Sequence, residues 1–343
     1  MDAEVRQKNR DNVCNRECVG TLIYNERIRQ SVGLSKLCDG LMSMGNLSRI
    51  KSGTRETDES IIKRLTDRLG MTFEDEGAYM FNNDYAEWQR RWRVIDAIEC
   101  GRISEAGLLI ERMYGRKVVR EQFAKVMRIQ CITSVESYEN MCSSRMQEIV
   151  RLYMEALSLT IPVNALKNVR MFVLAIDELN MVLEYQFYRG LEGGDKTDIK
   201  LLEDILKYLD GTRFSLSAKA KLYPKTVVYM YRMLAYGRSM EVVFRDTDKK
   251  LMDKLYKYCE RALDMLRENA VRYYLTEILE IRREFLVNRY GGGESDRLLR
   301  QTNEWLSAIH SLCCEYDVWE HMTNSCYFYK ENSVYNIGTV VRV

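Results

Sequence analysis

The chain has 343 residues, of which 46% are hydrophobic and 30% are charged, and its formal net charge is +2. This length suits two or three domains, or one small domain followed by an extended helical array. A net charge so close to zero excludes a polyanion-binding surface spread over the whole chain. The only prolines are Pro162 and Pro224, whereas proteins average about 5% proline. Because so little interrupts a helix, we expect an all-α fold.

The N-terminal sequence is polar, and no apolar run approaches the roughly 20 residues of a membrane span. We therefore predict a cytoplasmic protein without membrane contact. None of the ten cysteines forms a CxxC pair. Cys14 and Cys18 are four residues apart, without the second pair or nearby histidine that a zinc site needs. Reduced structural thiols are the favoured interpretation, with redox sensing through these two as the alternative. We expect no metal and no cofactor.

Residues 1–19 are predicted to form a polar N-terminal arm. Residues 20–71 differ from them in their pattern of apolar residues and glycines. There, short apolar patterns are broken by closely spaced glycines, which predicts several short helices joined by tight turns. Residues 1–71 also contain 13 Lys and Arg against 10 Asp and Glu. The remainder of the chain is slightly acidic, so any nucleic-acid contact is expected in this N-terminal part.

The pattern within residues 20–71 predicts a helix-turn-helix. Such a motif needs a small residue where its two helices cross, then a sharp turn, then a second helix with apolar anchors. Cys38 is small enough for the crossing, with the apolar Leu37 and Leu41 on either side of it. Gly40 opens the turn, and Ser43 is the expected N-cap of the second helix.

The second helix, over 43–53, is predicted to have two faces. Leu47 and Ile50 are three residues apart and face inward. The opposite face and the flanking turns carry side chains that can reach bases or phosphates. We predict that the DNA-binding residues are Ser35, Lys36, Ser43, Met44, Asn46, Ser48, Arg49, Lys51, Thr54 and Arg55. A further helix, over 58–69, should pack its apolar side chains on the first ones: Ile61, Ile62, Leu65 and Leu69.

The run S-x-x-x-L-S-R-I-x-x-G-x-R resembles the xenobiotic-response-element (XRE) type of repressor, the family of phage Cro and cI. The matching positions are Ser43, Leu47, Ser48, Arg49, Ile50, Gly53 and Arg55. With Leu37, Cys38 and Gly40 before the turn, the sequence is similar to the subgroup of peptide-sensing regulators of Gram-positive bacteria. This resemblance implies a lambda-repressor-like domain joined to a helical repeat array. Lys51 departs from the family, which usually has Glu there, and helix 2 is expected to begin at Ser31 or Ser35.

Residues 72–83 are an acidic linker, and residues 84–330 carry apolar side chains at i, i+3, i+4 and i+7 in successive segments of about 12 to 20 residues. Such stripes predict antiparallel helices that stack into a solenoid. Small residues near 97–110 lie at spacings that let two helices approach closely, as in tetratricopeptide (TPR) repeats. We therefore predict a TPR-like array.

Chemistry-bearing motifs are scarce. His310 and His321 lie in no metal-ligand spacing, and no phosphate-binding loop occurs, so we expect no enzyme. The array is rich in tyrosine and amide side chains that could grip a peptide, although core packing is the more common role of any one aromatic residue. The candidate ligand residues are Tyr153, Asn164, Asn168, Asn180, Tyr185 and Tyr231.

The predicted function is a transcriptional regulator that binds double-stranded DNA. Since one such domain makes few contacts, a homodimer is expected. The helical array would dimerise and sense a ligand, a short peptide by resemblance. The alternative is a TPR-like protein-interaction scaffold with a vestigial helix-turn-helix. The segment 331–343 resembles the start of another such domain, which suggests a chain truncated before it.

Overall fold

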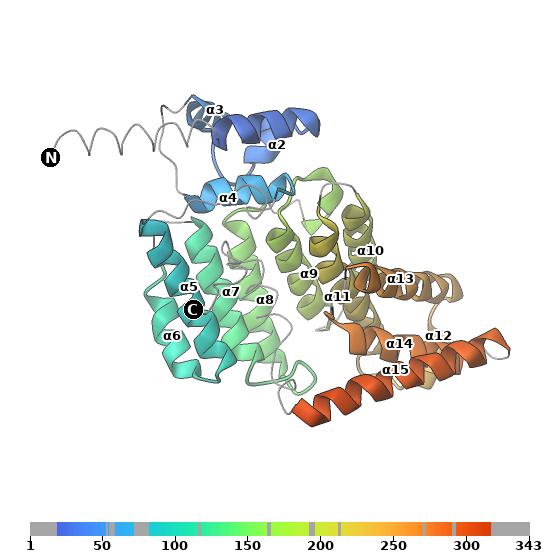
Figure 1. The fold of residues 1–343 in the computed structure, drawn as a ribbon. Coiled ribbons are helices and arrows are strands. Elements are labelled where there is room, and N and C mark those ends of the chain that lie inside the picture. Colours follow the sequence, from blue (N-terminus) through green and yellow to red (C-terminus); the bar gives the residue numbers. More distant parts are fainter. Residues whose placement is uncertain are drawn as a thin grey trace, which may run out of the picture. The chain divides into compact units, whose positions relative to one another are not determined.

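The computed structural model describes residues 19–52, 54, 59–71, 82–115, 118–162, 166–191, 196–211, 214–269, 272–289 and 293–316. Within these ranges all regular secondary structure is helical (Figure 1), which confirms the predicted all-α fold. The described residues form two compact units. The first contains residues 19–135 and 151–182, and the second contains 136–150 and 183–316.

The N-terminal part of the first unit is a small helical domain. Residues 19–29 are helical, and the helices that follow are α2 (Leu34–Cys38), α3 (Met44–Lys51) and α4 (Glu59–Arg68). Helix α2 begins at Leu34 instead of at Ser31 or Ser35, since the extended Gly33 is its N-cap residue. Helix α2 is only five residues long. Helix α2 packs on both α3 and α4.

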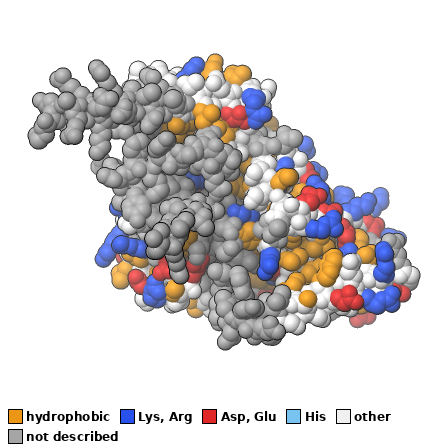
Figure 2. All heavy atoms as spheres, viewed as in Figure 1, with side chains coloured by type: hydrophobic (Ala, Val, Ile, Leu, Met, Phe, Trp, Pro, Cys, Tyr) orange, Lys and Arg blue, Asp and Glu red, His pale blue; other side chains and the backbone are white. Residues whose placement is uncertain are grey.

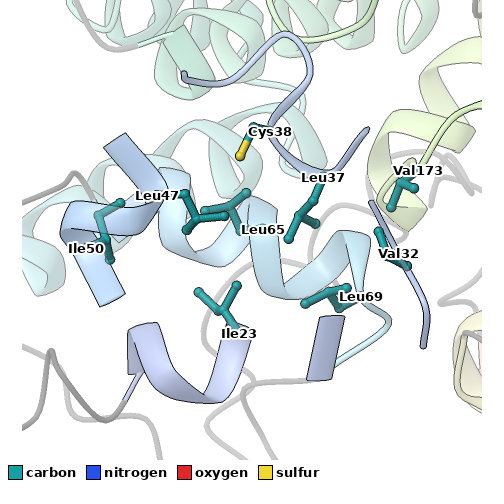
Figure 3. Close-up of a cluster of buried hydrophobic side chains, with 9 residues drawn as sticks. All are labelled: Ile23, Val32, Leu37, Cys38, Leu47, Ile50, Leu65, Leu69 and Val173. Carbon is teal, nitrogen blue, oxygen red and sulfur yellow. The ribbon is translucent and has the colours of Figure 1, made fainter. Parts of the chain in front are cut away.

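A compact apolar core holds these helices together. It is formed by Ile23, Val32, Leu37, Cys38, Leu47, Ile50, Leu65, Leu69 and Val173. Figure 3 shows Leu47, Leu65 and Ile23, from three different helices, pointing toward one another. The predicted anchors of the second helix, Leu47 and Ile50, are both buried. Burial of this apolar surface is the main force that stabilises so small a domain.

Further helices complete the first unit: α5 (Asn82–Glu99), α6 (Ile103–Glu111), α7 (Val118–Thr133) and the ends of α8 (Ser143–Ser158) and α9 (Ile176–Leu191) that lie within 151–182. Helices α5 and α6 form a close hairpin in which Ala97 and Ala106 are fully buried. Gly101 ends α5 with φ +70, and Arg102 N–H donates to the Ala97 carbonyl at 2.7 Å. A left-handed glycine just after a helix is a common helix ending, and the buried alanines fit the close helix approach that the small residues predicted.

The second unit contains α10 (Lys196–Asp210), α11 (Leu216–Ala235), α12 (Met240–Asp246), α13 (Lys249–Glu268), α14 (Leu275–Asn288) and α15 (Glu294–Tyr316). Helix α11 packs against α10, α12, α13 and α14, and residues 219–231 are buried along its whole circumference. Neighbouring helices pack in chain order, from α13 to α14 and from α14 to α15, as in a helical repeat array.

A short 3-10 turn (Val169–Met171) precedes α9, and the residues between them have no regular secondary structure. Helix α11 begins at Leu216, capped by Ser215, so Pro224 lies inside it. No described helix is long and apolar enough to cross a membrane.

Candidate DNA-binding interface

Helix α3 has one buried face and one exposed face. Leu47 and Ile50 enter the core, whereas Met44 is 51% exposed, and Ser48 and Arg49 are also exposed. The helix starts as predicted, since the Ser43 hydroxyl accepts a hydrogen bond from Asn46 N–H at 3.3 Å. This cap satisfies an amide that the helix itself leaves unpaired. The buried face therefore fixes the rotation of α3 about its axis, and with it the direction of the exposed face.

The turn before α3 depends on glycine. Gly40 has φ +72, a left-handed conformation that costs other residues steric strain. The turn is closed by the amides of Leu41 and Met42, which both donate to the Cys38 carbonyl at 2.9 and 3.0 Å. Gly40 and Cys38 thus have the positions expected of a helix-turn-helix, one in the turn and one buried at the crossing.

The C-terminal end of α3 is closed by two hydroxyl groups. Thr54 donates to the Arg49 carbonyl from both its amide, at 3.0 Å, and its hydroxyl, at 3.2 Å. The Ser52 hydroxyl donates to the same carbonyl at 3.1 Å. These bonds satisfy a carbonyl left unpaired at the helix end. They give Thr54 a capping role in addition to the DNA contact predicted for it.

Lys51 has an intramolecular partner. Its ammonium group lies 3.4 Å from the centroid of the Tyr24 ring, on the first helix. Tyr24 was not among the predicted residues. Because the two residues lie on different helices, no spacing within one helix could have indicated the pair. Gly20 permits the approach, since a Cβ there would lie 2.7 Å from Lys51 Cα.

The other predicted DNA-binding residues are distributed around α3. Ser35 and Lys36 are exposed on α2, and Ser43, Lys51 and Thr54 are exposed at the ends of α3. Asn46 is half-buried. Arg55 lies outside the described residues. Helix α3 has no acidic side chain, and Arg49 and Lys51 lie in its last turn. The structure thus brings together nine of the ten predicted side chains, and their contact with DNA stays a prediction.

Charge elsewhere on the surface is mixed. In the coloured part of the face drawn in Figure 2, Lys and Arg side chains are interspersed with Asp and Glu. Among the described residues, no group of three or more histidine, cysteine or acidic side chains could hold a metal ion.

The candidate ligand residues lie mostly in the helical core. Tyr153 and Asn180 are buried in the first unit, and Tyr185 and Tyr231 are buried in the second. Asn168 is exposed, and its side chain accepts a hydrogen bond from Arg170 N–H at 3.2 Å, which caps the 3-10 turn. Asn164 lies outside the described residues. A ligand role for these residues stays a prediction.

No protein-family model matches the chain, and no curated protein matches it. Among solved structures, the chain is similar to a crystal structure of Bacillus thuringiensis PlcR in complex with the peptide PapR7 and DNA. The TM-score is 0.45 and the identity 13%, over 93% of this chain and 99% of that chain. A similarity of this degree carries no functional conclusion, so the proposals below rest on the residues of this chain.

Proposed function

We propose that this protein is a DNA-binding transcriptional regulator and that α3 is the helix that enters the major groove. The observation that carries the proposal is the division of α3 into two faces: Leu47 and Ile50 fix it to the core, and Arg49 and Ser48 extend from the exposed side. A helix of this width fits the major groove, where arginine can donate two hydrogen bonds to guanine.

Helix α3 and its surroundings offer both kinds of contact that DNA recognition needs. Met44, Asn46 and Arg49 would face base edges, with Arg49 the strongest candidate for sequence recognition. Lys36 and Ser43 lie before or at the start of α3, where they would contact phosphates and set the position of the domain. Phosphate contacts carry no sequence information. Variants of the phosphate-contacting residues should therefore weaken binding to all duplexes, whereas variants of the base-contacting residues should change sequence selectivity.

The proposal is tested with duplexes selected from a random-sequence DNA library on the purified full-length chain. Arg49→Ala should weaken binding to the selected duplex by about 1–3 kcal/mol and relax selectivity at one base pair. Lys36→Ala should weaken all duplexes equally and lower the salt dependence by about one phosphate contact. Arg267→Ala, which removes an equally charged side chain that is 76% exposed on α13, is the control.

The result that would contradict the proposal is an Arg49→Ala variant whose affinity and selectivity equal those of the unmodified chain. Absence of any selected duplex, together with a stable complex with another protein, would support the scaffold interpretation instead.

We further propose that the helical array dimerises and senses a short peptide. A single helix-turn-helix makes few contacts, and two copies on adjacent half-sites give useful affinity. Sedimentation velocity should show a dimer. Native mass spectrometry of the purified chain should show a bound peptide that denaturation releases. A monomer at micromolar concentration, also with its selected duplex, would count against the dimer.

A further inference from the structure

Arg68, the last residue of α4, is buried and donates five hydrogen bonds. Nη1 donates to the carbonyls of Leu37 and Asp39, at 2.8 and 2.7 Å. Nη2 donates to the Thr160 carbonyl at 2.9 Å. The remaining two bonds, from Nε and Nη2, reach the two carboxylate oxygens of Glu178, both at 2.9 Å. Every N–H of the guanidinium is therefore used.

These partners belong to two different parts of the first unit. Leu37 and Asp39 lie at the C-terminal end of α2, immediately before the turn that leads to α3. The last carbonyls of a helix have no hydrogen-bond donor within the helix, and here the Arg68 guanidinium is that donor. Thr160 follows α8, and Glu178 is in the first turn of α9. One side chain thus ties the turn of the helix-turn-helix to the array.

Glu178 is itself fixed in place. It is fully buried, and one of its oxygens also accepts a hydrogen bond from Ala175 N–H at 2.9 Å, which caps α9. Burial raises the pKa of this carboxyl, but the charges of Arg68 and Arg64 and the hydrogen bonds outweigh it, so that the pKa lies below its ordinary value. Glu178 is therefore an anion at neutral pH, held by the arginine.

A second contact joins the same two parts. A Cβ added to Gly40 would lie 2.1 Å from the Thr160 carbonyl oxygen, so the turn packs directly against the end of α8. The Thr160 hydroxyl accepts a hydrogen bond from Gln122 Nε2 at 2.7 Å, and Arg64 Nη2 donates to the side-chain oxygen Oε1 of Gln122 at 2.9 Å. The contact is thus built from interlocked polar groups around Thr160.

We infer that Glu178, acting through Arg68, is a positioning residue for the turn that orients α3. The α8–α9 connection of the array would then determine the orientation in which the DNA-binding helix is held. This inference rests on the proposed function for its consequence in DNA binding. Any change in the array that moves Thr160 or Glu178 reaches the turn through the bonds described above. Neither residue needs to contact DNA.

Hydrogen–deuterium exchange of the full chain, without DNA, tests the contact itself. In Glu178→Gln, amides of residues 37–43 should exchange roughly tenfold faster or more, while those of α5 and α6 keep their protection. Glu155→Gln is the control: it neutralises another carboxylate of the first unit, whose ion-pair partners are Lys125 of α7, at 3.0 Å, and Arg151 of α8, at 2.5 Å. Its exchange over 37–43 should equal that of the unmodified chain.

A glycine pair gives a second test if Glu178→Gln fails to fold. Gly40→Ala should accelerate the same amides, because the methyl group clashes with Thr160. Gly101→Ala creates the same left-handed strain, at φ +70, where nothing lies within 4 Å of the new Cβ, so it should leave residues 37–43 unchanged. Equal acceleration throughout the first unit in Glu178→Gln and Gly40→Ala would overturn the inference, since it would show ordinary core stabilisation.

The affinity for the selected duplex is the functional readout. Glu178→Gln and Gly40→Ala should lose tenfold or more in affinity with an unchanged salt dependence, because no phosphate contact is removed. Faster exchange at 37–43 in a chain that binds no duplex would refute the proposed function and leave the positioning contact supported. Unchanged exchange would refute the positioning role whatever the DNA affinity.

Discussion

The Lys51 ammonium group stacks on the Tyr24 ring, 3.4 Å from its centroid, and so connects the end of α3 to the first helix. A cation over an aromatic face is attracted by the ring's negative quadrupole. Lys51 is one of the positions at which the sequence departs from the repressor pattern with which it was compared. The pair gives this departure a structural reason, since a glutamate would be repelled by the same ring face.

We expect the pair to stabilise the N-terminal domain by about 0.5–1 kcal/mol, the usual range for an exposed cation–π contact. A double-mutant cycle of Tyr24→Leu and Lys51→Met, followed by urea denaturation, should give a coupling energy of that size. Tyr24→Phe keeps the ring and should keep the coupling. A coupling near zero would mean that Lys51 is held by the helix alone.

Two glycines of the domain should respond in opposite directions to alanine. At Gly20 the new Cβ would lie 2.7 Å from Lys51 Cα and 2.8 Å from the Ile50 carbonyl oxygen, so the two helices must separate. This should cost about 1–3 kcal/mol. At Gly45, inside α3, nothing lies within 4 Å of the Cβ, so alanine should stabilise the helix by about 0.5–1 kcal/mol. Thermal unfolding of both variants measures the two effects. A destabilised Gly45→Ala would show that α3 needs the glycine for its backbone.

The second unit contains its own buried ion pair, between Lys225 of α11 and Glu184 of α9. The Tyr229 hydroxyl lies 3.1 Å from both carboxylate oxygens. Lys225→Met should destabilise the chain by about 3–5 kcal/mol, because it leaves a buried carboxylate without its cation. The double variant Lys225→Met with Glu184→Gln should recover much of that loss, since no charge then remains. Urea denaturation of the three chains measures both. A double variant no more stable than Lys225→Met would assign the loss to packing.

The sequence predicted the elements whose apolar spacing is regular. Leu47 and Ile50 indicated the inward face of α3, Ser43 its start, and the small residues Ala97 and Ala106 the close approach of α5 and α6. These are local patterns, and each lies within one helix or one turn. The same apolar spacing distinguished the side chains on the outer side of α3 from its buried residues, Leu47 and Ile50.

Contacts between distant segments could not be read in this way. Arg68 gave no sign of its partners, because Thr160 and Glu178 lie on other helices. Four of the candidate ligand tyrosines and asparagines are buried, although the aromatic content alone suggested a groove. Pro224 lies inside α11, about two turns after the start that the Ser215 cap gives this helix, and no local pattern indicated that the helix continues through the proline. Tertiary packing decides such cases.

The stabilisation contributed by Glu178 should depend on pH. Its folded-state pKa lies below the ordinary 4.5, since Arg68 and Arg64 outweigh the effect of burial, so the unfolded chain binds the proton more readily. This contribution is complete above the unfolded pKa and is lost as pH falls through the folded one. From pH 7 to about 5.5, the unfolding free energy of Glu178→Gln should therefore lie a constant amount below that of the unmodified chain. Below about pH 4.5, this difference between the two unfolding free energies should become smaller. Asp67, whose pKa is raised by burial, shifts stability in the opposite direction but is present in both chains and cancels. Urea denaturation of both chains across this pH range measures the difference in unfolding free energy. A difference that stays constant down to about pH 3.5 would show that Glu178→Gln destabilises the chain through lost packing and not through the lost charge.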